Sequence, residues 1–500
     1  MNKAPLLSVL KLFALLFTNR WIHQWEQPHR PPPPPPSPRL PWKLRKKSNR
    51  ARPKKNRPKA PRRGRGFYQR IFTLRVALWY LIFQRLNFDQ SLAAVMRDLR
   101  RGGADRLGPR RRKLSQRIKS SQTSAYNQAR QRMPLELLQA AFAYLGQQIL
   151  LLAGLAAPSS KEKPAPAKRQ RQLLDGSTLR MLTTPKLKKA FRPARGQTDW
   201  CLMRIVVGFC ARTGAILSTA QEAIRTSEQK MAWAILEKAV PWVIWIADRN
   251  FGVWSVVAQA AHHRHHRQDV VVRLTRARAG RLVGGEKLPS GTDRAIQWSP
   301  TRHDQGAEST PRNPVAGRLI YVQIERAGRP VDLWLFTTLE ASDYPLELLV
   351  QWYGQRWQAE LHFRSVKTQM RLAQLDVCSP EMAVKEFYAA ILGYNFVRAV
   401  MWAAGEHLES GVQTLSFANA RRAVLDWILD WTSGVGHATG TDQRWAQSLL
   451  EEIRQQKLPK RKKPRPSEVR MVRRCASKWP VLKGSRKAAR KRHEKRTKSV

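Results

Sequence analysis

The stretch YGQRWQAELHFRSVK, residues 353–367, carries one carboxylate, Glu360, among basic and aromatic side chains. At about 100° per residue of an α-helix, one stripe contains six polar side chains, namely Tyr353, Arg356, Glu360, Arg364, Lys367 and Arg371. The apolar side chains lie about 80° or more away and are expected to pack on a core, namely Leu361, Phe363, Val366 and Met370. A solvated helix alternates its charges in i,i+4 pairs, which leaves a lone carboxylate in a basic stripe unexplained.

Two aspartates occupy similar places earlier in the chain. Asp175 ends the apolar run QLLD before Gly-Ser, and Asp248 ends WVIWIAD before Arg-Asn-Phe-Gly. Open α/β sheets place their functional sites at the carboxyl ends of buried strands. A buried carboxylate requires a cation, a hydrogen-bond donor or a metal. Each aspartate alone is more simply a turn or helix-cap residue.

Taken together, the three carboxylates predict a metal site beside a phosphate-binding surface. Oxygen ligands suit Mg²⁺ or Mn²⁺. Two such ions, about 3.5–4 Å apart, clamp the attacking and leaving oxygens of an in-line displacement. In this interpretation Glu360 binds metal, and the cations of its stripe, with Tyr353, hold the phosphodiester.

Composition points to a polyanionic partner. The 500 residues include 92 Lys+Arg and 35 Asp+Glu, a formal charge of +57. Nucleic acid is the leading partner, because Lys and Arg release counterions from phosphates. A membrane surface is the weaker interpretation, because the sequence shows no long basic amphipathic helix with a clean apolar face. The opening run MNKAPLLSVLKLFALLF is interrupted by Lys11 and is expected to be a soluble or disordered leader, not a signal peptide or anchor; a start codon placed too early would explain it.

The cysteines predict neither a disulfide framework nor a zinc site, because no CxxC pair occurs among Cys201, Cys210, Cys378 and Cys475. His262 and His266 have a spacing able to bind zinc, but a solvated helix end among arginines is the simpler interpretation.

Six segments follow from composition and periodicity. We expect a basic Pro-rich disordered arm at 1–66, a helical region at 67–156, a core at 170–278 and 341–376, a β-rich insertion at 279–340, a helical region at 377–456 and a basic disordered tail at 457–500. The region 67–156 either presents a helix to a DNA groove or is an ordinary helical subdomain.

Local patterns place elements within these segments. Strands are predicted at 171–182, 200–213, 242–248 and 268–278, with a hairpin at 317–325 and 330–339. Helices are predicted on either side of Asn87–Asp89 and at 134–152, 227–240, up to about 264, 344–376 and 380–455.

The residues of the stripe carry a family resemblance. Tyr353, Arg356, Glu360 and Lys367 reproduce the Y-x2-R-x3-E-x6-K signature of bacterial insertion-sequence DDE transposases. Asp175 in LLDGST and Asp248 in IADRNF resemble the family's first and second catalytic aspartates, with Asn250 where glycine is common. The resemblance covers about residues 70–405 and includes the stretch 371–401 after the signature.

The resemblance implies an α/β fold with an RNase H-like catalytic core, a β-rich insertion, an N-terminal helical DNA-binding region and a C-terminal helical region. It implies that Asp175, Asp248 and Glu360 bind two Mg²⁺ or Mn²⁺ ions. Cut-and-paste movement through a DNA hairpin is the expected activity. The expected partners are double-stranded DNA, as element-end inverted repeats and target, and a second copy of the chain, in the bacterial nucleoid and away from membranes.

The same resemblance implies a set of DNA contacts, namely Tyr353, Arg356, Arg364, Lys367 and Arg371. Trp298 is the candidate that stacks on a flipped base, which is worth about 1–3 kcal/mol. Trp298 could equally be a core residue, and Trp254 and Trp334 compete for the role. Two other classes stay open: a catalytically degenerate transposase-derived DNA-binding protein, and a structural polycation without a carboxylate cluster.

Overall fold

The computed structural model describes the main body of the chain and one C-terminal helix. The described residues are 22, 71–108, 112–155, 164–192, 200–263, 268–304, 306, 310, 312–326, 329–405, 408, 411–433, 442–459 and 484–497. The predicted arm at 1–66, apart from residue 22, and most of the predicted tail lie outside this set. Within the tail the structure has helix α18 (Arg486–Thr497), where no ordered element was expected. This helix falls in a separate unit from residues 71–326 and 330–458.

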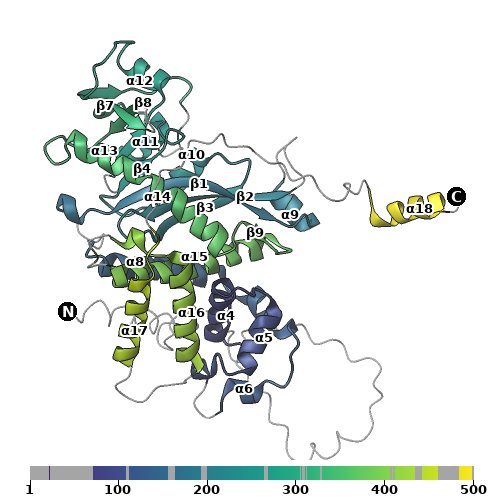
Figure 1. Ribbon diagram of the computed structural model, residues 1–500. Coiled ribbons are helices and arrows are strands. Elements are labelled where there is room, and N and C mark those ends of the chain that lie inside the picture. The colour runs from purple at the N-terminus through teal and green to yellow at the C-terminus, as the bar shows by residue number, and fades with distance from the viewer. Residues whose placement is uncertain are drawn as a thin grey trace, which may run out of the picture. The chain divides into compact units, whose positions relative to one another are not determined.

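One mixed nine-stranded sheet organises the larger unit (Figure 1). Its order is β3-β2-β1-β4-β5-β8-β7-β6, with β9 paired to β1. β1 is antiparallel to β2 and parallel to β4, and β4 is parallel to β5. The strands are β1 (Arg171–Met181), β2 (Cys201–Cys210), β3 (Ile216–Ala223), β4 (Ile244–Ala247), β5 (Asp269–Arg273), β6 (Thr292–Trp298), β7 (Val315–Arg326), β8 (Arg329–Thr337) and β9 (Gln374–Leu375). The strands predicted at 171–182 and 200–213 are confirmed as β1 and β2, and the two strands of the predicted hairpin are neighbours in the sheet, as β7 and β8.

Helices cover the sheet through two hydrophobic clusters. Leu174, Val206 and the β4 residues Trp245 and Ala247 share one cluster with α10 (Glu228–Glu237) and α11 (Trp254–Ala261). Side chains of β1 and β2 that point the other way, such as Leu173 and Phe209, join the second cluster, because successive strand residues face opposite sides. Its helices are α4 (Leu74–Leu86), α5 (Leu92–Arg100), α7 (Ser124–Arg132), α8 (Leu135–Leu152), α13 (Leu346–Gln355), α14 (Trp357–Arg364), α15 (Pro380–Gly405), α16 (Phe417–Ser433) and α17 (Asp442–Gln455).

The N-terminal helices are continuous with this core. α4 is buried along almost its whole length and packs on α15, and α8 packs on α15 and β3. α8 is also long and apolar enough to cross a membrane by length and composition alone, a test that core helices of folded proteins pass as well. Its packing on α15 and β3 accounts for its apolar residues.

Two predicted elements end earlier than expected. The predicted strand at 268–278 stops at Arg273, because the side chain of Thr275 accepts a hydrogen bond from the Arg278 amide and caps α12 (Arg276–Leu282). The predicted helix at 344–376 is interrupted at Arg356 and continues as α14 and a π-helical turn, η3 (Ser365–Gln369). Strand β9 then replaces its last residues.

The predicted β-rich insertion continues the central sheet. β8 pairs antiparallel with β5, and Val271, Val272 and Arg273 face Thr337, Phe336 and Leu335. The insertion thus extends the sheet on which the carboxylates lie.

Candidate active site

The register of two parallel strands places the first two carboxylates side by side. The last paired residues of β1 and β4 are Leu174 and Ala247, so Asp175 and Asp248 follow on adjacent strands. Neighbouring strands lie about 4.7–4.9 Å apart. β4 ends here, whereas β1 continues to Met181 through its pairing with β2. The sequence-predicted aspartates therefore meet at the carboxyl end of β4.

Helix α14 packs on β1 and brings the third carboxylate to the same place (Figure 1). Arg356, at the junction of α13 and α14, lies between two acids. Its Nη1 is 3.7 Å from Asp175 Oδ2, and its Nη2 is 3.7 Å from Glu360 Oε1. The side chains of Arg356 and Asp175 are 17% and 18% exposed, whereas that of Glu360 is 35% exposed. We call Asp175, Asp248 and Glu360 the carboxylate site.

The electrostatics of this site favour a cation. Burial raises the pKa of Asp175 to about 6, with Asp248 adding to the rise while the Gly176 amide and Arg356 oppose it. Burial works against the charge of Arg356, yet Tyr353 and the three carboxylates raise the pKa of its guanidinium. Burial also raises the pKa of the Tyr353 phenol. Positive charge is thus stabilised where the carboxylates meet.

The donor set fits a hard divalent cation in type. The site offers carboxylate oxygens, the ligands that Mg²⁺ and Mn²⁺ prefer. Across the described residues, no group of three His, Cys, Asp or Glu side chains is already gathered as a metal ion requires. Arg356 instead provides the positive charge between Asp175 and Glu360. Metal binding would therefore require these side chains to converge.

Sequence reasoning missed two residues beside the site. Glu228, in the first turn of α10, has its carboxyl carbon 2.4 Å from where a Cβ on Gly176 would stand. Its Oε2 accepts a hydrogen bond from the side-chain Nδ2 of Asn250 at 2.7 Å. The backbone N–H of Asn250 donates to Asp248 Oδ1 at 2.9 Å. The glycine after Asp175 and the asparagine two residues after Asp248 could be noticed in the sequence. Only the fold shows that Glu228 lies beside both.

The rest of the predicted stripe divides at the π-helical turn. Arg364 is exposed on α14, and half-buried Lys367 lies within the turn. Arg371 lies beyond it with a φ of 54° and donates from Nη1 to the Phe88 carbonyl at 2.6 Å. The prediction that Arg371 shares one helical stripe with Glu360 is wrong, because the helix ends before it.

Trp298 lies in the core of the insertion. Its side chain is 5% exposed and contacts Phe336 edge-on, with ring centroids 5.0 Å apart. Trp254 is buried as well, and Trp334 stacks on Tyr321. The burial of Trp298 contradicts the predicted stacking role and agrees with the alternative of a core residue. Of the two histidines, His262 ends α11 and His266 lies outside the described residues.

Comparison with known proteins agrees with this geometry. Residues 166–396, a little under half of the chain, match the family model described as a transposase DDE domain. The match includes all three residues of the carboxylate site. This part of the chain is thus similar to the DDE domain of transposases.

One curated relative and one solved structure are similar over longer stretches. The transposase InsG for insertion sequence element IS4 of Escherichia coli (strain K12) is 25% identical over 267 residues, which cover 51% of this chain. The chain spans 58% of that relative's length. A cryo-EM structure of the piggyBac transposase synaptic complex with hairpin DNA aligns over 92% of this chain and 87% of its own, with 12% identity and a TM-score of 0.38. A score this low supports no inference about this chain.

Proposed function

We propose that the protein is a DNA transposase of the IS4 type that moves an insertion sequence by cut-and-paste. The observation that carries the proposal is the position of Arg356 between Asp175 and Glu360, with Asp248 on the strand next to Asp175, in a region similar to a transposase DDE domain. The strand order β3-β2-β1-β4-β5, antiparallel at first and then parallel, supports an RNase H-like core.

The three carboxylates would hold the divalent ions, Mg²⁺ or Mn²⁺, expected as a pair. When bound, such ions lower the pKa of a water and offset charge on the phosphate. Arg356 and Tyr353 border the carboxylates and would hold the phosphodiester there, and Arg364 and Lys367 would hold it further along the same helical run. Positioning of this kind converts bound DNA into a reactive geometry.

In the proposed reaction, the oxygen of water bonds to phosphorus and the 3′-oxygen of the neighbouring nucleotide leaves and takes up a proton. The freed 3′-hydroxyl then attacks a phosphorus of the opposite strand, and the 3′-oxygen of the flanking DNA leaves and takes up the proton, which gives a hairpin. Water attacks the same phosphorus and releases the 3′-hydroxyl again, which then attacks a phosphorus of target DNA and displaces a 3′-oxygen there. Two element ends must be held together, so the working form would be a homodimer on double-stranded DNA, in the nucleoid where that DNA lies.

Glu360→Gln tests the proposal because it removes a negative charge and preserves side-chain size. We expect Mg²⁺-dependent strand cleavage to fall at least about a thousandfold, or roughly 4 kcal/mol of activation free energy. Affinity for an inverted-repeat duplex should change less than about twofold, because the cations remain. Glu347→Gln, an exposed acid on α13, is the matched control. Undiminished cleavage by Glu360→Gln contradicts the proposal.

A catalytically degenerate DNA-binding derivative is the second candidate. The position of Arg356 between Asp175 and Glu360 favours it, because the guanidinium already provides the charge that a metal would bring. The two candidate functions predict different cleavage activities for the unaltered chain. Binding without any cleavage in Mg²⁺ or Mn²⁺ supports the derivative.

A further inference from the structure

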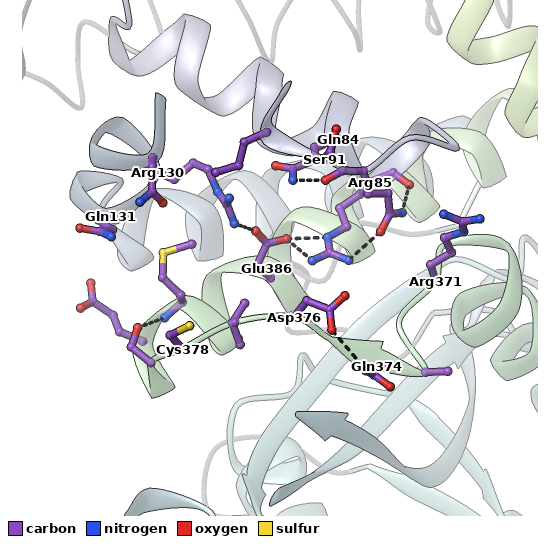
Figure 2. Close-up of a pocket in the computed structure, with 18 of the residues that line it drawn as sticks. Gln84, Arg85, Ser91, Arg130, Gln131, Arg371, Gln374, Asp376, Cys378 and Glu386 are labelled. Atoms are coloured by element: carbon purple, nitrogen blue, oxygen red, sulfur yellow. Dashed lines mark hydrogen bonds and ion pairs between the residues drawn. The ribbon is translucent and has the colours of Figure 1, made fainter. Parts of the chain in front are cut away.

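A groove of about 1020 Å³ lies beyond the carboxylate site, between the N-terminal helices and the segment that follows η3 (Figure 2). Residues of α4, α5 and α7 line one wall. Residues of η3, β9 and the start of α15 line the other, and Lys186 of the short helix α9 (Pro185–Ala190) reaches the same space. We call this the basic groove.

The acids that line the basic groove are engaged with their neighbours. Glu386, 1% exposed, is bound by both Arg85 and Arg130, as Figure 2 shows. Asp376 accepts a hydrogen bond from Gln374 at 2.9 Å, and the third acid, Glu381, pairs with a lysine of its own helix. Cations thus neutralise Glu386 and Glu381, whereas Asp376 keeps its charge beside a neutral amide.

Three further cations face the groove. The side-chain ammonium groups of Lys186 and Lys367 form no hydrogen bond or ion pair with any residue that the structure describes. Burial and the nearby Arg180 lower the pKa of Lys367, so its ammonium lies where an anion would stabilise it. Arg371 is anchored through one N–H to the Phe88 carbonyl, which orients its guanidinium and leaves further donors. The groove therefore provides positive charge for a ligand.

The ligand's size and chemistry follow from the groove's other features. Its volume is at the upper end of clefts that enclose ligands, about 300–1,000 Å³, which admits a few nucleotides of one strand and not a duplex. α7 adds two amides, Asn127 and Gln131, whose side chains bond to no described residue and can donate to and accept from base edges. Lys367 lies seven residues after Glu360, or roughly 10 Å along the helix. At about 3.4 Å per phosphate of one strand, that distance spans about three nucleotides.

We propose that the basic groove binds a single-stranded segment of DNA, with its phosphates on Lys186, Lys367 and Arg371, about three nucleotides from the phosphate at the carboxylate site. The inference rests on the proposed function, because it assigns a path to the strand that would be cut. It adds Lys186 and the N-terminal helices to the DNA-contacting surface. The N-terminal helices thereby form one wall of a strand-binding groove.

The test measures binding of the full-length chain to a labelled single strand and to a duplex of the same sequence, by fluorescence anisotropy across a salt series. For Lys186→Gln we expect the slope of log K against log salt for the single strand to become shallower by about 0.7, with affinity at 0.2 M salt about fivefold lower. Duplex binding should change less than about twofold. Lys188→Gln, on the same helix but outside the groove, is the matched control.

An unchanged single-strand slope in both Lys186→Gln and Lys367→Gln overturns the inference, and so does an equal loss for strand and duplex. The Glu360→Gln variant separates this failure from failure of the proposed function. If it still abolishes cleavage while the groove variants bind normally, only the groove assignment falls. If the unaltered chain binds single strands through the groove but never cleaves, only the cleavage proposal falls.

Discussion

The two ends of the helical run from Arg356 to Gln369 are surrounded by side chains of opposite charge. At its start, the carboxylate site surrounds one arginine with three acids. At its end, the basic groove pairs two of its three acids with cations and leaves the side chains of Lys186 and Lys367 unpaired among the described residues. An acidic site attracts a small cation, whereas the groove requires an anion from outside the chain. A phosphodiester crossing both, with a metal at one end, satisfies the two requirements together.

The largest expected effect concerns the wall of the groove. Glu386→Gln leaves the buried guanidiniums of Arg85 and Arg130 without a counter-charge. Breaking such a buried pair costs about 3–5 kcal/mol, which urea unfolding of the full chain would measure. Glu286→Gln, in a pair with Arg294 whose side chains are 54% and 50% exposed, should cost less than about 1 kcal/mol. Equal losses for the two variants would show that Glu386 does not hold the N-terminal helices on α15.

The next prediction compares how metal binding at the carboxylate site and single-strand binding at the basic groove depend on pH. Burial raises the pKa of Asp175 to about 6 from 3.8, so its proton must leave before a metal binds. We expect affinity for Mn²⁺, measured by titration calorimetry, to rise about tenfold between pH 5 and pH 7. Single-strand binding at the groove should change far less. A flat Mn²⁺ profile would remove Asp175 from the metal site.

The raised pKa of Asp175 also determines how this residue's contribution to the free energy of unfolding depends on pH. The native state holds the Asp175 proton up to about pH 6, whereas the unfolded chain loses it near 3.8. Without metal, this carboxyl therefore favours the folded state below pH 4, and the contribution is lost as pH rises toward 6. Asp175→Asn should remove that part of the pH dependence.

The smallest effect concerns the residues missed at the carboxylate site. Glu228→Ala and Asn250→Ala each remove one side of the 2.7 Å hydrogen bond that supports the Asp248 turn. The bond is exposed, so the coupling free energy from a double-mutant cycle should be about 0.5–1 kcal/mol in cleavage. Glu228→Gln keeps an acceptor oxygen and should restore most of the activity. Strict additivity would show that Glu228 does not act through Asn250.

Sequence patterns singled out Asp248 and Glu360 because each stands in a simple local pattern, whereas Asp175 lies within β1 and not at its end. Asp248 follows a fully buried strand, and Glu360 follows helical spacing from Tyr353. The pattern failed at Arg371, because a 100° count assumes an uninterrupted α-helix, and the π-helical turn and positive φ change the direction of the chain. Glu228 could not be predicted from the sequence, for a different reason. Its place depends on how β3 leads into α10 beneath Gly176, which no local spacing encodes.

The pairing of β8 with β5 has a mechanical consequence. Three successive residue pairs join the insertion to the strand next to β4, and β4 runs directly into Asp248. A load applied to the insertion is therefore transmitted through backbone hydrogen bonds to the turn that carries an acid of the site. The insertion and the turn at Asp248 thus belong to one hydrogen-bonded sheet, and we expect a ligand that displaces the insertion to shift that acid as well.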